Sequence, residues 1–414
     1  MCDCYAGSVL ISVHRGDDFA PRAIEESFGH DRISTLDDAA GRDLSGLGLD
    51  HRYYQVDVPA GDEQARADRF RRDYADVLLR SNPGPAMLRQ CLLDADFTPI
   101  AQPEALATTS AQPAAGPAAP FAFTPEHQRY RQLLSVPPGT AGSPAVTVGV
   151  IDSGWQAPAG LSPSVISEAD LTTSPVGSTA TDVCGHGSVV LAIIDDLAPG
   201  TRFRVYKVGD SSCREWTLLA GLASAADDRC DIVNASTGFG LKDRNCAVCG
   251  RDYGTTRSQV FHRLLAGLLD GNDDLAYVGA AGNQGASRAC YPARFSPAIC
   301  VASTDGQGAL STFSNRGNYD QDDAPHPCLI LAPGGNRLQA GAGADEYVAA
   351  NQGTDWRGTS FSAAYVTGLL AHRLAQSGSM TRTALISGLI GAASAGRVQA
   401  YAQSDHGAGL AQHF

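Results

Sequence analysis

Four residues, far apart in this 414-residue chain, carry the side chains that acyl transfer through a covalent intermediate requires. Asp152 ends an apolar run, His186 stands between two glycines, and Ser360 follows a Gly-Thr pair. Asn283 lies between the histidine and the serine, in a Gly-Asn-Gln-Gly segment. A serine nucleophile needs a base, the base needs an orienting carboxylate, and the oxyanion needs a donor such as an amide. The set as a whole therefore predicts acyl-transfer chemistry.

Each of these residues also has an ordinary structural use. Asp152 and Asn283 are common turn residues, and Ser360 stands where a helix N-cap is expected. A histidine at a helix start, such as His186, is more often structural than catalytic. All four, however, lie beside the expected end of a strand or helix, and this joint placement favours the catalytic interpretation.

The elements that would position these residues alternate between strand and helix from about residue 125. The run 145–151 is continuously apolar, as is typical of a strand buried on both faces. Further strands are expected at 203–208, 232–233, 275–280, 298–302 and 329–332, and helices at 188–197, 216–226, 257–269 and 360–376. This alternation predicts an α/β fold with a mostly parallel central sheet, and it places Asp152 at a carboxyl end, where sites form.

Composition shifts along the chain suggest three parts. Residues 1–100 show strand and helix patterns and predict a small N-terminal α/β unit. Residues 101–124 are rich in Ala, Pro, Thr and Ser, which predicts an exposed linker. Residues 125–414 would then form the larger catalytic domain.

The formal net charge of -13 argues against nucleic acid or an anionic membrane as the main partner. No stretch approaches the apolar length of a transmembrane helix. The first residues, Met-Cys-Asp-Cys-Tyr, lack a basic region followed by an apolar run. We therefore expect a cytoplasmic protein.

The 11 cysteines are an odd number in a chain without a recognised signal, which predicts mostly free thiols. Cys246-Ala-Val-Cys249 is half of a zinc-site pattern, and Cys213, Cys230 or Cys290 would have to complete it. Free or locally paired thiols are the alternative, and we assign no metal ligands from the sequence.

The catalytic candidates and their flanks resemble the subtilisin-like serine proteases, or subtilases, over roughly residues 125–375. The order Asp, His, Ser is the one this family uses, with an oxyanion asparagine between the last two. Other segments are similar to family segments: 203–208, 231–238, 291–293, 313–317 and 331–334. The resemblance implies a three-layer subtilisin-like domain and a serine endopeptidase in which Ser360 attacks, His186 transfers the proton and Asp152 orients it. Asn283 and the Ser360 N–H would hold the oxyanion.

The resemblance also implies a substrate cleft and protein or peptide substrates. One wall of the main specificity pocket would be Ser236, Thr237 and Gly238, and the other Ala280, Ala281 and Gly282. Small residues on both walls imply room for a sizeable side chain at P1, the residue before the cleaved bond. Asp182 would face the P2 side chain. No cofactor is implied, and a family calcium site stays open.

Several positions depart from the family pattern. Ala364 and Tyr365 replace a common Pro and His, and Ser188 replaces the Thr expected after the histidine motif. Residues 240–256 look like an insertion near the cleft. Cys184, two residues before the histidine, would make activity sensitive to thiol reagents by crowding.

Residues 1–104 resemble a subtilase pro-domain only in outline, so an unrelated accessory unit remains the alternative. As a pro-domain, this part would inhibit the catalytic domain within the same chain. We expect a dedicated processing or regulated protease, rather than a general digestive one. The alternative from another class is a catalytically inactive protease fold that binds or regulates.

Overall fold

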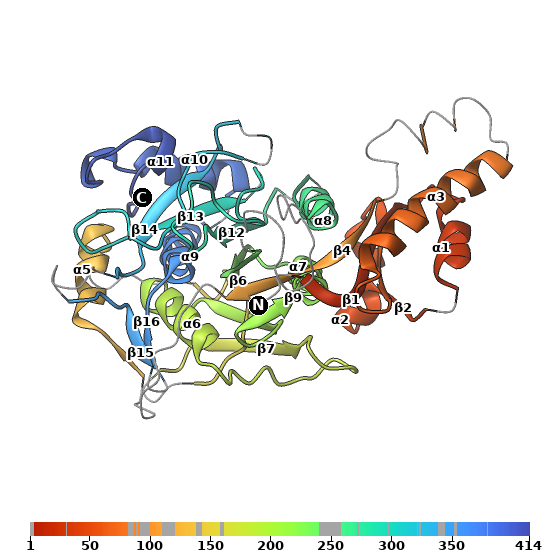
Figure 1. Cartoon of the computed structure of the whole chain (residues 1–414). Helices are drawn as coiled ribbons and strands as arrows, with labels where there is room; N and C mark the ends of the chain where they lie inside the picture. Colours follow the sequence, from red (N-terminus) through yellow and green to blue (C-terminus); the bar gives the residue numbers. More distant parts are fainter. Residues whose placement is uncertain are drawn as a thin grey trace.

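The structure is a computed structural model that describes residues 4–29, 31–81, 87, 90–91, 100–109, 121–137, 143–157, 161–239, 258–270, 273–296, 298–320, 322, 324–337, 344–351, 354–378 and 380–414. Figure 1 shows a large α/β body and a smaller N-terminal unit beside it.

A seven-stranded sheet forms the centre of the larger body, in the order β14-β13-β12-β10-β6-β8-β7. All of its pairings are parallel, as the alternating pattern predicts. The strands are β6 (Thr147–Asp152), β7 (Ser164–Asp170), β8 (Arg202–Lys207), β10 (Ile232–Ala235), β12 (Ala276–Ala280), β13 (Ile299–Thr304) and β14 (Leu329–Pro333). The predicted α/β class with a mostly parallel sheet is therefore confirmed.

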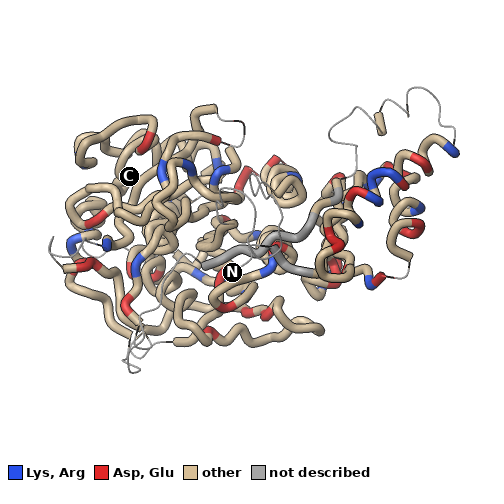
Figure 2. Tube along the Cα trace, viewed as in Figure 1, with Lys and Arg blue, Asp and Glu red and all other residues tan. Residues whose placement is uncertain are grey.

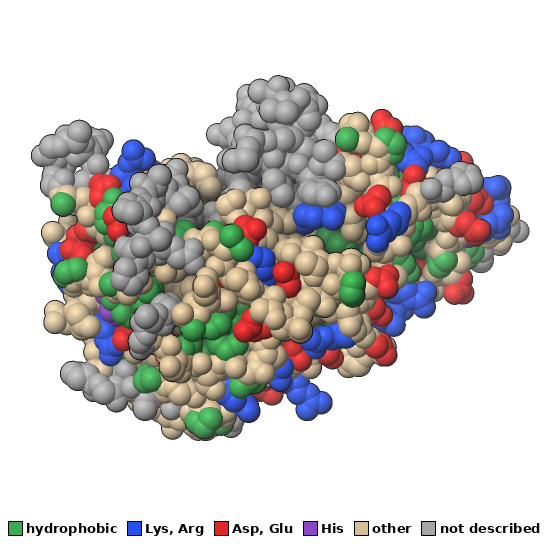
Figure 3. Space-filling view, turned by 90° about the horizontal axis from the view of Figure 1, so that it is seen from below, with side chains coloured by type: hydrophobic (Ala, Val, Ile, Leu, Met, Phe, Trp, Pro, Cys, Tyr) green, Lys and Arg blue, Asp and Glu red, His purple; other side chains and the backbone are tan. Residues whose placement is uncertain are grey.

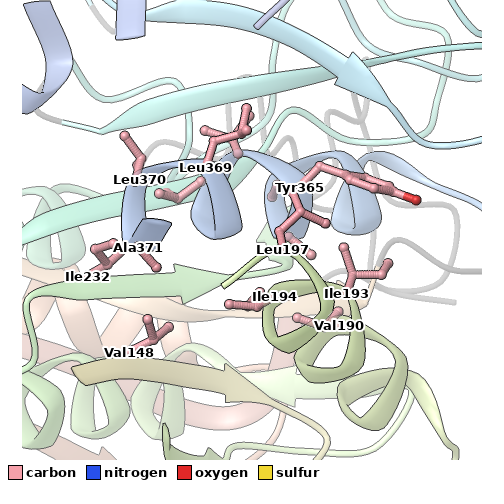
Figure 4. Packing of buried hydrophobic residues seen from close by; sticks show 14 of the residues in the cluster. Val148, Val190, Ile193, Ile194, Leu197, Ile232, Tyr365, Leu369, Leu370 and Ala371 are labelled. Carbon is pink, nitrogen blue, oxygen red and sulfur yellow. The ribbon is translucent and has the colours of Figure 1, made fainter. Parts of the chain in front are cut away.

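Helices cover both faces of this sheet, which explains why its central strands are continuously apolar. Val148 of β6 packs in one core with α6 (His186–Leu197) and α9 (Thr359–Ser377). Figure 4 shows α6 and α9 meeting through Ile194, Leu197 and Tyr365 among others. On the other face, Ile151 packs with α7 (Glu215–Asp227) and α8 (Gln259–Asp270).

Smaller elements surround these layers. The strands β5 (Ala122–Phe123), β15 (Ala349–Asn351) and β16 (Thr354–Trp356) form a second, antiparallel sheet. The remaining elements of the larger body are α5 (Pro125–Leu133), β9 (Ser212–Arg214), β11 (Thr237–Phe239), α10 (Arg382–Ala392), η2 (Ala395–Arg397) and α11 (Gln403–His406).

The N-terminal unit is an antiparallel sheet with the helices α1 (Ala20–Phe28) and α3 (Glu63–Ser81) on its outer face and two shorter helices on the side of the larger body. Its strands are β1 (Cys4–His14), β2 (Ile33–Thr35), β3 (His51–Asp57) and β4 (Ile100–Thr109). The shorter helices are α2 (Leu36–Ala40) and η1 (Ser45–Leu47). Aromatic side chains of α1 and α3, including Phe28 and Phe70, fill a core that this unit has to itself.

The expected linker, residues 101–124, needs a correction at both ends, and at its end β5 (Ala122–Phe123) pairs with β15. Residues 101–109 belong to β4, which pairs with β1 and extends from the N-terminal unit to the larger body (Figure 1). Backbone hydrogen bonds to neighbouring strands hold such a strand without requiring apolar side chains, so composition misses it. Residues 110–120 of the expected linker lie outside the described part of the chain.

Charged residues of both signs alternate along α3 and α1 in Figure 2. On the face shown in Figure 3, hydrophobic side chains form separate patches between polar and charged ones. Within the described residues, no helix combines the length and the apolar character needed to cross a membrane.

Candidate active site

Asp152 and His186 form the centre of the candidate site. Asp152 is the last residue of β6 and is fully buried, and His186 is the first residue of α6. His186 Nδ1 lies 2.6 Å from Asp152 Oδ1, and the Ser153 N–H donates to the same oxygen at 2.7 Å. The carboxylate therefore fixes the proton on Nδ1 and leaves Nε2 as the acceptor.

The second ring nitrogen of His186 faces an apolar surround. The rings of Trp356 and Phe361 lie 5.6 Å and 5.3 Å from the imidazole. Nε2 is buried and has no hydrogen-bond partner among the described residues. A buried, unpaired basic nitrogen is costly, and such atoms are typical of functional sites. The Ser360 hydroxyl is bonded to Ser236 O instead, so the described structure does not join the nucleophile candidate to the histidine by a hydrogen bond.

Ser360 is held at the first turn of α9. Its Oγ donates to the carbonyl oxygen of Ser236 at 3.1 Å, and Ser236 Oγ donates back to the Ser360 carbonyl at 3.0 Å. The start of the helix places backbone N–H groups, which carry partial positive charge, beside this serine. The geometry suits a nucleophile whose developing oxyanion would meet those N–H groups.

Asn283 is tied to the same helix start. Its Oδ1 accepts hydrogen bonds from the Thr359 N–H and the Thr359 hydroxyl, each at 2.9 Å. The Thr359 hydroxyl also accepts from the Gly282 N–H at 3.1 Å. Because the oxygen of the side-chain amide is held by the helix, the NH₂ group is the end that remains for a ligand.

Asn315 supports this loop, a role that sequence reasoning missed. Its Oδ1 accepts from the N–H groups of Gln284 and Ala286 at 3.0 and 2.9 Å, and its Nδ2 donates to Ala281 O at 3.0 Å. The side chain is fully buried. The sequence signal for this residue was the Phe-Ser-Asn-Arg-Gly segment, which is similar to a family segment. That similarity did not reveal the contact between Asn315 and the loop that carries Asn283.

Asp182 does not face a P2 side chain, so that expectation is wrong. The residue is fully buried, and its carboxylate accepts from the Gly185 N–H, the Ser188 N–H and the Ser188 hydroxyl at 2.8, 2.8 and 2.6 Å. The Ser153 hydroxyl also lies 2.9 Å from its Oδ1 and 3.2 Å from Asp152 Oδ1. Asp182 thus caps the helix that His186 begins, and Ser153 links it to the orienting carboxylate.

The residues expected to line the specificity pocket are all buried and lie on neighbouring strands. Ser236, Thr237 and Gly238 follow β10, while Ala280, Ala281 and Gly282 follow the adjacent β12. The segment Cys290–Tyr291 joins the two sets. The Cys290 N–H donates to Ala281 O at 2.8 Å, and the Phe239 N–H donates to Tyr291 O at 2.7 Å.

Strand β4 of the N-terminal unit is paired with one of these walls, the segment Thr237–Phe239. It pairs antiparallel with β11 through Thr109 and Thr237, then Thr108 and Gly238. On its other edge it pairs antiparallel with β9, where Ala107 lies opposite Cys213. The backbone of β4 is therefore held on both sides, as an extended peptide would be in a cleft.

Some of the residues that could bind a metal ion lie outside the described part of the chain. Within the described part of the chain, no group of three or more His, Cys, Asp or Glu side chains is placed to hold a metal ion. Cys246 and Cys249, the half zinc pattern, and the whole expected insertion, residues 240–256, lie outside the described residues.

The sequence predicted that modification of Cys184 would reduce activity. From the structure we predict instead that iodoacetamide does not reduce activity through Cys184. Burial, followed by the negative charge of Asp182, raises the pKa of Cys184 to about 12. The thiolate is the reactive form, so at pH 7.5 the thiol stays neutral and slow to alkylate. Activity should survive treatment that fully alkylates glutathione, and mass spectrometry should find Cys184 unmodified. Rapid inactivation that a Cys184→Ala variant escapes would contradict this.

Comparisons with known proteins agree with the fold. A sequence model of the subtilase family matches residues 143–410. The structure of a lanthipeptide protease superposes with a TM-score of 0.56 at 18% identity, covering 70% of this chain and 95% of that one. Fervidolysin from Fervidobacterium pennivorans, described as a keratinolytic enzyme related to subtilisin, gives a TM-score of 0.63 at 15% identity. That match covers 99% of this chain, which spans 60% of fervidolysin's length.

Proposed function

The chain belongs to the subtilase family and is a serine endopeptidase, and on that basis we propose that Ser360, His186 and Asp152 form its catalytic triad. The observation that carries this proposal is the 2.6 Å contact between His186 Nδ1 and Asp152 Oδ1, fully buried, with Nε2 left unpaired among the described residues. A histidine held in this way is a general base.

In the proposed mechanism, the Ser360 hydroxyl rotates from Ser236 O toward His186 Nε2. Oγ bonds to the carbonyl carbon of the substrate as its proton passes to Nε2, and the carbonyl electrons move to oxygen. The C–N bond then breaks, and the leaving amine takes the proton from His186. Water repeats the sequence on the acyl-enzyme and releases the acid.

Asn283 and the Ser360 backbone N–H would stabilise the tetrahedral oxyanion. The Asn283 side chain is fixed by Thr359, immediately before the nucleophile, so its NH₂ group cannot drift far from the reacting carbon. Removing one such donor lowers kcat by about 10²–10³-fold, as in the example of subtilisin.

Labelling with a fluorophosphonate tests the triad directly. The probe reacts only with an activated serine, so the processed chain, freed of the N-terminal unit, should take up one equivalent, and peptide mapping should find it on Ser360. A heat-unfolded sample serves as the control and should take up none. A folded protein that reacts nowhere would instead support the inactive, binding or regulatory alternative.

We further propose that the N-terminal unit inhibits the protease within the same chain. The support is β4, whose last residues pair with β11 at the very wall expected to bind substrate. Beyond the strand, side chains of both parts share one core beside α7 and α8. Its members include Leu36, Leu44 and Tyr53 from the N-terminal unit and Trp216, Leu219 and Leu264 from the larger body.

A polar contact between the N-terminal unit and the larger body allows inhibition to be tested by a single substitution. Arg42 lies 2.8 Å from Asp228 and 3.4 Å from Asp227, with its side chain only 32% exposed. We predict that Arg42→Ala weakens inhibition about 3- to 10-fold, since a part-buried ion pair contributes on the order of 1 kcal/mol. Residues 1–109 would be added to the processed enzyme, and Ki measured from peptide hydrolysis.

The matched control for this test is Arg22→Ala. Arg22 pairs with Glu26 on the outer helix α1, away from the larger body, and its side chain is 58% exposed. Its loss should leave Ki unchanged. Equal Ki values for all three fragments, or no inhibition by the wild-type fragment, would speak against the proposed interface.

A protease whose cleft is occupied by its own chain acts only after a regulated release, so we propose a dedicated processing or regulated enzyme. Two measurements test this proposal: the rate of casein digestion and a proteome-wide survey of cleavage sites. Narrow sequence preference in the survey and slow casein digestion are expected; rapid casein digestion at many unrelated sites would indicate a general digestive enzyme.

A further inference from the structure

Lys207 lies at the carboxyl end of β8, directly beside the candidate orienting carboxylate in the sheet. Strands β6 and β8 are in parallel register with Asp152 opposite Lys207, and the Val208 N–H donates to Asp152 O at 2.9 Å. The lysine is only 6% exposed, and a charged side chain is almost never buried this far unless it is paired. The partners of its ammonium therefore show what this residue holds in place.

The ammonium of Lys207 joins two separate loops, one before α6 and one after β8. Its Nζ donates to Thr181 O at 2.8 Å in the first loop and lies 2.6 Å from Asp210 Oδ1 in the second. Hydrogen bonds from a charged donor are stronger than those between neutral groups. Lys207 thus fixes the position of each loop relative to the other.

The first of these loops leads to the catalytic candidate His186. Thr181 directly precedes Asp182, whose carboxylate accepts from the N–H groups of Gly185 and Ser188. These two residues flank the His186-Gly187 pair at the start of α6. A shift of Thr181 would therefore reach the imidazole through a single capping residue.

The second loop leads to the strand that pairs with an extended peptide in the cleft. Asp210 lies in a tight turn that is closed by a bridge between Gly209 and Cys213. A methyl group placed on Gly209 would lie 2.1 Å from Ser212 O, so this turn is closely packed. Strand β9 begins at Ser212 and pairs antiparallel with β4, so it would pair with the backbone of a substrate in the same place.

From these contacts we propose that Lys207 is a positioning residue that couples the peptide-pairing strand β9 to His186. The inference rests on the proposed function, because it concerns the reaction at that same site. Substrate residues that pair with β9 lie away from the cleaved bond, and their binding energy can be used to orient the reacting groups. Lengthening a substrate along β9 then raises kcat as well as lowering KM, and the path runs through Asp210, Lys207 and Thr181.

The test compares wild type with Lys207→Met, which keeps an unbranched side chain and removes the ammonium. Both are used after self-processing, with active sites counted by fluorophosphonate. Two p-nitroanilide substrates share the P1 residue that the cleavage survey favours, and one ends there while the other extends to P4. In wild type the extension should raise kcat at least about tenfold, since a displacement of about 1 Å can cost about 10²-fold in rate.

In Lys207→Met the extension should still lower KM, but it should raise kcat by less than about twofold. Lys207→Arg keeps the positive charge and several donors, so it should retain most of the wild-type gain. If Lys207→Met fails to fold or to process itself, Asp210→Asn takes its place, because the Asp210 side chain is 56% exposed and its change should be tolerated. That variant should also show a reduced gain.

Arg204→Met is the matched control, since Arg204 lies in the same strand but contacts Ser167 and Asp228 instead of either loop. It should keep the wild-type gain. A wild type whose kcat does not rise with substrate length, or variants at Lys207 and Asp210 that keep the full gain, would overturn the coupling. Labelled Ser360 would leave the proposed function standing in that case, whereas absence of labelling in wild type would remove both.

Discussion

Replacing Ser360 by alanine should lower kcat/KM by about 10⁴-fold or more and leave the full-length chain uncut. The hydroxyl is the only group in the proposed mechanism that bonds to the substrate carbon, so no neighbour can replace it. The same change should cost little stability, because it removes one hydrogen bond to Ser236 O and leaves the helix start intact. Peptide hydrolysis, thermal unfolding and N-terminal mapping of the purified chain measure the three effects.

Ser362→Ala is the control for this variant. Ser362 lies two residues further along α9, is also fully buried, and has no hydrogen-bond partner for its Oγ among the described residues. It should keep wild-type activity and self-cleavage. If Ser360→Ala protein were still cut after β4 at the wild-type rate, either the nucleophile is another residue or a contaminating protease makes the cut; adding active enzyme to the variant would separate these.

The strands and helices around the site were predictable because each carries a strong local signal. Parallel strands such as β6 are covered on both faces, so their side chains are apolar without interruption. The motif residues then fall at strand ends and helix starts by chain order alone. The predicted helix from 360 to 376 differs from α9 (Thr359–Ser377) by one residue at each end.

The strand β4 was not predictable from composition, for a physical reason. Its side chains are mostly small, and the hydrogen bonds that hold it come from β1, β9 and β11, which lie far away in sequence. Edge pairing depends on the backbone, which every residue offers equally. Only the folded arrangement shows that this segment ends in the cleft.

The role of Asp182 was missed for a related reason. A motif match assigns residues by their flanks and does not show which way a side chain turns. Asp182 looked available because it precedes the histidine in a polar loop. In the structure it turns inward, where the N–H groups at the start of α6 need an acceptor.

Asp182→Ala is predicted to be the most damaging substitution outside the triad. It leaves the buried Gly185 N–H and the Ser188 N–H and hydroxyl without their acceptor, and an unsatisfied buried donor costs about 1–3 kcal/mol. The loss of an anion from a helix start adds to this. We expect the free energy of unfolding to fall by about 3–5 kcal/mol, measured by urea denaturation of the catalytically inactive Ser360→Ala form to avoid self-digestion.

The Asp182→Ala variant should also lose more activity than its lower stability accounts for. His186 follows Gly185 directly, so a loosened helix start shifts the imidazole relative to the nucleophile, and a displacement of about 1 Å can cost about 10²-fold in rate. Because Asp182 does not contact substrate, kcat should fall while KM stays near wild type, at a temperature where the variant is fully folded. Asp170→Ala, whose carboxylate caps only the exposed Thr172 turn, is the control and should change neither value. A raised KM with unchanged kcat would return Asp182 to the substrate-facing role that the buried contacts exclude.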